Sequence, residues 1–220
     1  MVKALSREDM ARIVANDIPD GYYVNLGIGI PTLVSAKLPQ GKPITLHSEN
    51  GILGMGPAQP SETPDLDLIN ASKEPVALLA GSSICDHLVS FSMMRGGHID
   101  LTVLGAFQVA QNGDLANWDT GEEGAIPAVG GAMDLVVGAK RVWVTMSHTA
   151  RDGTPKIVPE CTYPLTGKGV VDRIYTDLAM IDFTPDGLVV RGMVPSMTHE
   201  HLQSLTAVPL LKDSNCRVLI

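Results

Sequence analysis

The chain has 220 residues, of which 45% are hydrophobic and only 4% aromatic, and its formal net charge is −8. This length suits one α/β domain, residues 1–220, and is short for two. The acidic balance argues against general nucleic-acid binding, which requires a basic surface. A core with so few aromatic side chains must consist of Val, Ile, Leu, Ala and Met, which suit buried parallel strands.

The chain contains three cysteines, Cys85, Cys161 and Cys216, and no Cys-x-x-Cys pair. The sequence therefore predicts neither a zinc site nor a disulfide framework, and reduced thiols favour a cytoplasmic location. Residues 1–6 do not resemble a signal peptide. No apolar run reaches the roughly 20 residues that span a bilayer. We expect no bound metal and no membrane segment.

Helical and strand signals alternate along the chain. Ser6 and Asp9 resemble a capping box, Pro31 suits the first turn of a helix, and Pro185-Asp186-Gly187 suits a hairpin turn. In chain order we expect helix 6–15, strand 22–26, helix 31–38, strand 43–47, loop 52–57, loop 59–67, strand 76–80, helix 82–94, strand 101–104, a loop-rich stretch with short strands over 105–127, helix 132–137, strand 141–146, helix 170–174, strand 178–183, strand 188–191 and helix 198–205. This alternation favours a three-layer α/β fold, with an open, mainly parallel sheet and helices on both faces.

The segment Ser48-Glu49-Asn50-Gly51 carries the clearest chemical signal. It follows the expected strand 43–47 and precedes a glycine-rich stretch. Sites in α/β folds cluster at the carboxyl ends of strands, and glycine lets a ligand or another backbone approach closely. A glutamate held there can act as a base, a ligand or a covalent nucleophile. A salt-bridged structural glutamate is the equal alternative.

The same segment, continued through Ile52-Leu53-Gly54-Met55-Gly56-Pro57, resembles the active-site motif of the B (beta) chains of class I coenzyme A (CoA) transferases. Four further segments resemble motifs of that family and follow one another in the same order as in the family. They are residues 25–31, 95–100, 113–118 and 130–135. The similarity extends from about Ser6 to Asp186. Three other stretches are most similar to the family's beta chains that act on 3-oxoadipate, and they are residues 92–98, 126–131 and 158–167.

The resemblance implies that Glu49 is a covalent nucleophile. Its carboxylate would take CoA from succinyl-CoA as a glutamyl thioester and pass it to 3-oxoadipate, without hydrolysis. No cofactor is expected, because the CoA thioester is a substrate. Gly130 and Gly131 are expected to supply an oxyanion-hole amide. The residues themselves do not say which glycine does so, and tight packing of a helix against a strand is their alternative role.

Three more residues are candidates for binding CoA or substrate. The resemblance places Lys73 near CoA, and a solvated loop lysine is the alternative. Asn25 ends the first expected strand, where it either hydrogen-bonds in the cleft or caps the glycine turn. Asn50 either orients Glu49 or binds the pantetheine amide. A Cys–His pair at Cys85 and His87 is disfavoured, because side chains this close on one segment seldom face each other.

The resemblance also implies a partner. The family's A subunit contributes to the site at the interface, so we expect a hetero-oligomer, typically a heterotetramer, and an inactive isolated chain. Acetoacetate is the alternative acceptor. A non-catalytic CoA-binding subunit and a sugar-phosphate isomerase are the alternatives from other classes. A 3-oxoadipate site needs a cation or N–H cluster for the second carboxylate. Arg95, Arg151 or a residue of the A subunit could provide it.

Overall fold

The computed structural model describes residues 2–58, 63, 65–121, 124, 127 and 129–219. Parts of the expected loops 59–67 and 105–127 therefore lie outside the described residues. Within the described ranges, no helix is both long enough and apolar enough to cross a membrane.

The described helices cover short segments. They are α1 (Arg7–Asp17), α2 (Ile30–Val34), the 3-10 helix η1 (Ser35–Lys37), α3 (His87–Arg95), α4 (Ala132–Gly138) and α5 (His199–Ser204). The strands are β1 (Tyr23–Leu26), β2 (Thr45–Ser48), β3 (Ile52–Pro57), β4 (Val76–Ile84), β5 (Leu101–Gly105), β6 (Gln108–Ala110), β7 (Leu115–Ala116), β8 (Val142–Met146), β9 (Ile157–Val158), β10 (Arg173–Thr176), β11 (Ala179–Thr184), β12 (Gly187–Met193) and β13 (Leu210–Val218).

The large sheet has ten strands in the order β13-β12-β11-β10-β8-β5-β1-β2-β3-β4. Its centre, from β10 through β8, β5 and β1 to β2, is parallel throughout. Antiparallel pairs flank this centre on both sides, at β2-β3-β4 and at β10-β11-β12. The expected parallel sheet is thus confirmed for the part that carries the site, and the whole sheet is mixed.

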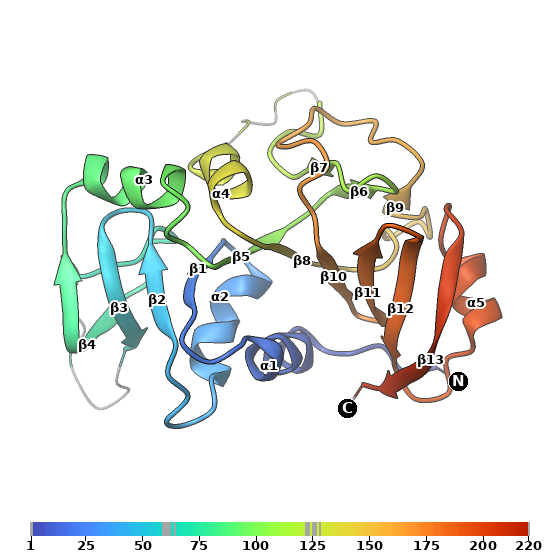
Figure 1. The fold of residues 1–220 in the computed structure, drawn as a ribbon, viewed down its shortest axis with the longest axis horizontal. Coiled ribbons are helices and arrows are strands. Elements are labelled where there is room, and N and C mark those ends of the chain that lie inside the picture. Colours follow the sequence, from blue (N-terminus) through green and yellow to red (C-terminus); the bar gives the residue numbers. More distant parts are fainter. Residues whose placement is uncertain are drawn as a thin grey trace.

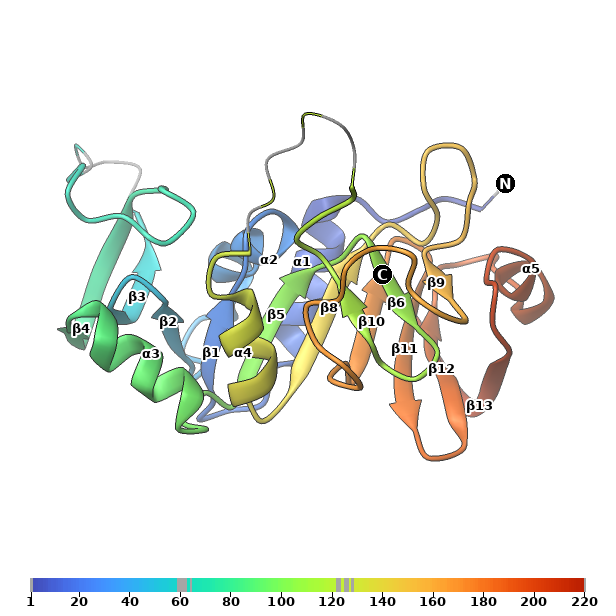
Figure 2. The same cartoon turned by 90° about the horizontal axis from the view of Figure 1, so that it is seen from above.

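Helices cover both faces of the sheet. Figure 1 shows α1 and α2 on one face and α3 and α4 on the other. The burial pattern agrees, because Ala11 and Val14 of α1 belong to one apolar cluster. Met94 of α3 and Leu135 of α4 belong to another cluster. The small sheet β7-β6-β9 lies on the same side as α4 (Figures 1 and 2). The three-layer arrangement is therefore confirmed.

The prediction of a helix over 170–174 is wrong. Arg173–Thr176 form β10, which pairs with β8 on one side and with β11 on the other. Ile174 is fully buried between them. The segment is short and apolar and has no clear helical pattern. Strands on both sides of it supply hydrogen-bond partners for its backbone N–H and C=O groups, so it forms a strand.

Two predictions for the segments around β3 and β4 also need correction. Residues 52–57 are not a loop but strand β3, in which Gly54 has φ +84° and lies at a bulge opposite β4. The backbone after Gly81 stays extended to Ile84, so the helix begins later than expected, at His87. Asp86 caps that helix by accepting a hydrogen bond from the Val89 N–H at 2.9 Å.

Candidate active site

Glu49 lies in the tight turn that joins β2 to β3. β2 is parallel to β1 and pairs with it in register, so the turn stands at the carboxyl edge of the central strands. Gly51 has φ +112°, and a Cβ atom at this position would overlap the carbonyl oxygen of Cys85. Only glycine fits such a conformation in contact with another backbone. The turn therefore needs the glycine of the motif, and it leaves Glu49 half-buried.

Gly130 and Gly131 lie directly beside the carboxylate of Glu49, although they are far from it in the sequence. Gly131 precedes α4, and a Cβ atom there would overlap Glu49 Oε2 and lie 3.3 Å from Cζ of Phe91. A Cβ atom at Gly130 would lie 3.7 Å from Glu49 Oε1. The Glu49 carboxylate therefore occupies the space that a side chain at position 131 would fill.

The electrostatic setting of Glu49 follows from the same contacts. Burial raises the pKa of Glu49 and is the largest effect. The backbone N–H of Gly131 and then the nearby His87 lower the pKa, whereas Asp134 raises it. A partly dehydrated carboxylate thus stays close to one backbone donor and one imidazole.

The expected CoA-binding residues divide into two groups. Asn50 donates a hydrogen bond from Nδ2 to the Ile69 carbonyl at 2.7 Å. This contact holds the loop that contains Lys73, an exposed residue with φ +63°, against the Glu49 turn. Asn25, in contrast, is only 3% exposed, and its Nδ2 lies 3.1 Å from His47 Nδ1. The structure therefore brings Asn50 and the Lys73 loop to the rim of the site and places Asn25 beneath it.

Sequence reasoning assigned no role at Glu49 to four residues around it, although it weighed and disfavoured one of them, His87, as part of a Cys–His pair. They are His47, His87, Ser90 and Phe91. Period-two alternation could have pointed to His47, because it is the register partner of Asn25 and so shares its face of the sheet. The other three come from α3, which only the tertiary fold brings to the turn.

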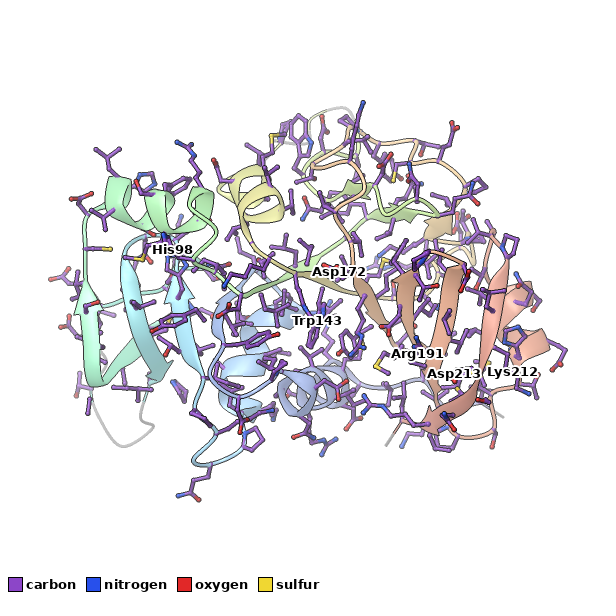
Figure 3. All side chains as sticks on the ribbon, in the orientation of Figure 1. His98, Trp143, Asp172, Arg191, Lys212 and Asp213 are labelled. Carbon is purple, nitrogen blue, oxygen red and sulfur yellow. The ribbon has the colours of Figure 1, made fainter. Side chains whose placement is uncertain are left out.

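Two arginines, Arg95 and Arg191, are already paired with carboxylates. Arg95 Nε donates to Asp134 Oδ1 at 2.6 Å. Arg191 pairs with Asp213 on β12 and β13, and Figure 3 shows both far from α3 and from His98 in the loop after it. In the part of the chain that the structure describes, no group of three or more His, Cys, Asp or Glu residues is arranged to hold a metal ion.

Comparisons with known proteins agree with this geometry. The family model described as coenzyme A transferase matches residues 7–204. The B subunit of the 3-oxoadipate CoA-transferase of Pseudomonas putida is 58% identical over 212 residues, which cover 96% of this chain and 99% of that protein. The B subunit of the succinyl-CoA:3-ketoacid coenzyme A transferase of Helicobacter pylori strain 26695 is 48% identical over 182 residues, which cover 83% and 87%.

A solved structure shows the same fold. The chain superimposes on an acyl-CoA transferase from Escherichia coli O157:H7 with a TM-score of 0.76 and 20% identity, and the match covers 98% of this chain and 43% of that longer one. At this identity the likeness concerns the fold alone. The family model and the two sequence relatives decide the membership. The chain therefore belongs to the coenzyme A transferase family and corresponds to the B subunit of its class I enzymes.

Proposed function

We propose that this chain is the catalytic B subunit of an enzyme that transfers CoA from succinyl-CoA to 3-oxoadipate. The contact between the Glu49 carboxylate and Gly131 at the start of α4 carries the chemical part of the proposal. The 58% identity to a protein named for 3-oxoadipate supports the acceptor. We place the protein in the cytoplasm, in a heterotetramer with an A subunit.

Glu49 works as a nucleophile in this scheme. Its carboxylate attacks the thioester carbonyl of succinyl-CoA and forms a mixed anhydride while CoA leaves as a thiolate. The thiolate then attacks the Glu49 carbonyl, which releases succinate and leaves a glutamyl-CoA thioester. The carboxylate of 3-oxoadipate attacks this thioester and displaces the thiolate. The thiolate finally attacks the 3-oxoadipyl carbonyl, which gives 3-oxoadipyl-CoA and free Glu49.

We assign the oxyanion-stabilising amide to Gly131. When the Glu49 carbonyl becomes tetrahedral, negative charge develops on an oxygen that already lies beside this N–H in the resting chain. A fixed donor of this kind contributes about 3 kcal/mol to a transition state. Gly130, with φ +50°, shapes the turn that directs the Gly131 N–H towards the carboxylate.

An exposed apolar surface near the catalytic turn fits the A subunit. Ile84 is 65% exposed and Leu88 is 77% exposed. Both lie within three residues of Cys85, whose N–H donates to the Gly51 carbonyl at 2.9 Å. Exposed apolar side chains this close to a half-buried nucleophile are suited to a partner that covers the site and excludes water. We therefore expect the isolated chain to lack activity.

Intact-mass spectrometry of the chain co-purified with its A subunit tests the proposal. Succinyl-CoA is added without an acceptor, and Glu49→Gln serves as the control. A mass increase that matches a CoA thioester, maps to Glu49, is absent from the control and is discharged by 3-oxoadipate is the expected result. Discharge by acetoacetate alone would keep the mechanism and change the acceptor. No adduct on a complex shown to bind CoA would favour a non-catalytic binding subunit.

A further inference from the structure

A chain of buried hydrogen bonds ends on the backbone of Glu49. The Asn25 Nδ2 atom lies 3.1 Å from His47 Nδ1, and His47 Nε2 lies 3.0 Å from Ser90 Oγ. The Ser90 hydroxyl donates to the Glu49 carbonyl oxygen at 2.7 Å. These side chains come from β1, β2 and α3, and Ser90 is completely buried. These hydrogen bonds therefore connect two neighbouring strands of the sheet and one covering helix to a single peptide group of the catalytic turn.

The direction of these hydrogen bonds follows from chemistry. An amide nitrogen only donates, so Nδ1 of His47 must accept the bond from Asn25. In a neutral imidazole the proton then resides on Nε2, which donates to Ser90. Burial lowers the pKa of His47 to about 4, so the ring is neutral at neutral pH. The Ser90 hydroxyl proton is consequently left to point at the Glu49 carbonyl.

Ser90 does not behave as serines in helices usually do. A helical serine commonly bonds to the carbonyl one turn earlier, and Ser92 in the same helix does so with Leu88 at 2.8 Å. Ser90 instead reaches across to the Glu49 turn. The donor from His47 occupies a lone pair of the Ser90 oxygen and favours this outward orientation of the hydroxyl.

We propose that His47 and Ser90 are positioning residues that fix the Glu49 backbone, and with it the carboxylate, against the Gly131 amide. The inference rests on the nucleophilic role of Glu49 proposed above. Helix α3 strengthens the argument, because it also carries Phe91, the side chain packed beside Gly131. Helix α3 thus contacts the Glu49 peptide group through Ser90 and packs beside Gly131 through Phe91.

The variant Ser90→Ala, compared with Ser92→Ala, tests the inference in the complex with the A subunit. Both remove one hydroxyl from α3, but only the first breaks the contact with Glu49. Single-turnover formation of the Glu49 thioester is expected to slow about tenfold to 100-fold in Ser90→Ala, since misplacement of a reacting group costs up to that much. The KM for succinyl-CoA is expected to stay unchanged, and Ser92→Ala should match wild type.

A double variant tests the link between the two residues. His47→Phe keeps a ring in the cavity but removes both hydrogen bonds. His47→Phe/Ser90→Ala is expected to be no slower than Ser90→Ala alone, because residues of one network are not additive. If the two substitutions slowed thioester formation independently and additively, the proposed hydrogen-bonded link between His47 and Ser90 would be wrong. If Ser90→Ala fails to assemble, Ser90→Cys replaces it as a same-shape variant with a weak donor, and wild-type turnover in that variant would overturn the inference.

The same experiment separates this inference from the proposed function. A wild-type complex that binds CoA and forms no Glu49 adduct would refute both the nucleophilic role of Glu49 and the positioning role of His47 and Ser90. If the wild-type complex forms the adduct, and Ser90→Ala forms it as fast as Ser92→Ala, only the positioning role of His47 and Ser90 is refuted. A higher KM at unchanged turnover would also refute it, because it would assign Ser90 to substrate binding instead.

Discussion

Replacing Gly131 with alanine is the sharpest test of the site geometry. Gly131 has φ −86° and ψ 6°, a bridge-region conformation that non-glycine residues also adopt in turns. The added methyl group, however, would overlap Glu49 Oε2 and press on Phe91. The backbone can therefore keep its place, and the carboxylate has to move away from the amide.

We expect a large loss of reaction rate, because the substitution both displaces the carboxylate and removes its contact with the amide donor. A displacement of about 1 Å can slow a reaction about 100-fold, and loss of one oxyanion donor costs about 100-fold to 1,000-fold. We expect Gly131→Ala to form the glutamyl thioester at least about 100-fold more slowly, equivalent to about 2.7 kcal/mol. The assay is single-turnover adduct formation from succinyl-CoA, followed by intact mass in the complex with the A subunit.

Gly105→Ala is the matched control. Gly105 lies at the carboxyl end of β5, and a Cβ atom there would meet its nearest neighbour, the Ile28 carbonyl oxygen, only at 3.9 Å. This variant adds the same methyl group without a clash and should form the adduct at the wild-type rate. Rapid adduct formation in Gly131→Ala, similar to that of Gly105→Ala, would refute the contact between Gly131 and the nucleophile.

Three further predictions concern charge and assembly. Glu49→Gln should be inactive yet unfold at a higher temperature at neutral pH, because burial raises the pKa of Glu49 and its ionised form therefore costs stability above the unfolded pKa; a lower Tm would contradict this. His87→Ala removes a charge that lowers the pKa of Glu49, so the acid limb of the kcat/KM profile should move to higher pH; an unmoved limb would contradict it. Leu88→Asp should weaken binding to the A subunit in size-exclusion chromatography, whereas Val218→Asp, at a side chain that is 63% exposed on the opposite edge strand, should not; equal effects would refute the interface.

The central strands could be predicted because their signal is local. β5 and β8 are short apolar runs between turn residues, and both are almost entirely buried. Their order in the sheet, with β5 between β8 and β1, could not be read from periodicity. The edge strand β13 was not predicted, since exposed polar residues such as Lys212 and Asn215 interrupt its apolar pattern.

The site was predictable where one segment carries both the chemistry and its geometry. Glu49 and Gly51 are two residues apart, and the positive φ of Gly51 explains why the glycine follows the carboxylate. The support from α3 was not predictable, because Ser90 and Phe91 belong to an ordinary amphipathic sequence. Their roles arise only when the helix packs over β1 and β2. Asn25 shows the same limit, since its amide faces a buried histidine and not the rim.

The charges near Glu49 also bear on the choice of acceptor. A dicarboxylate acceptor needs a cation that is not already neutralised, and Arg95 is paired with Asp134 at 2.6 Å. Among the described residues, His87 is the one side chain whose charge lowers the pKa of Glu49. Selection for the second carboxylate therefore falls to His87, to the exposed Lys73 or Arg151, or to the A subunit. The ratio of discharge by 3-oxoadipate to discharge by acetoacetate, measured in His87→Ala, Lys73→Ala and Arg151→Ala, decides among them. A ratio that none of these variants changes assigns the selection to the A subunit.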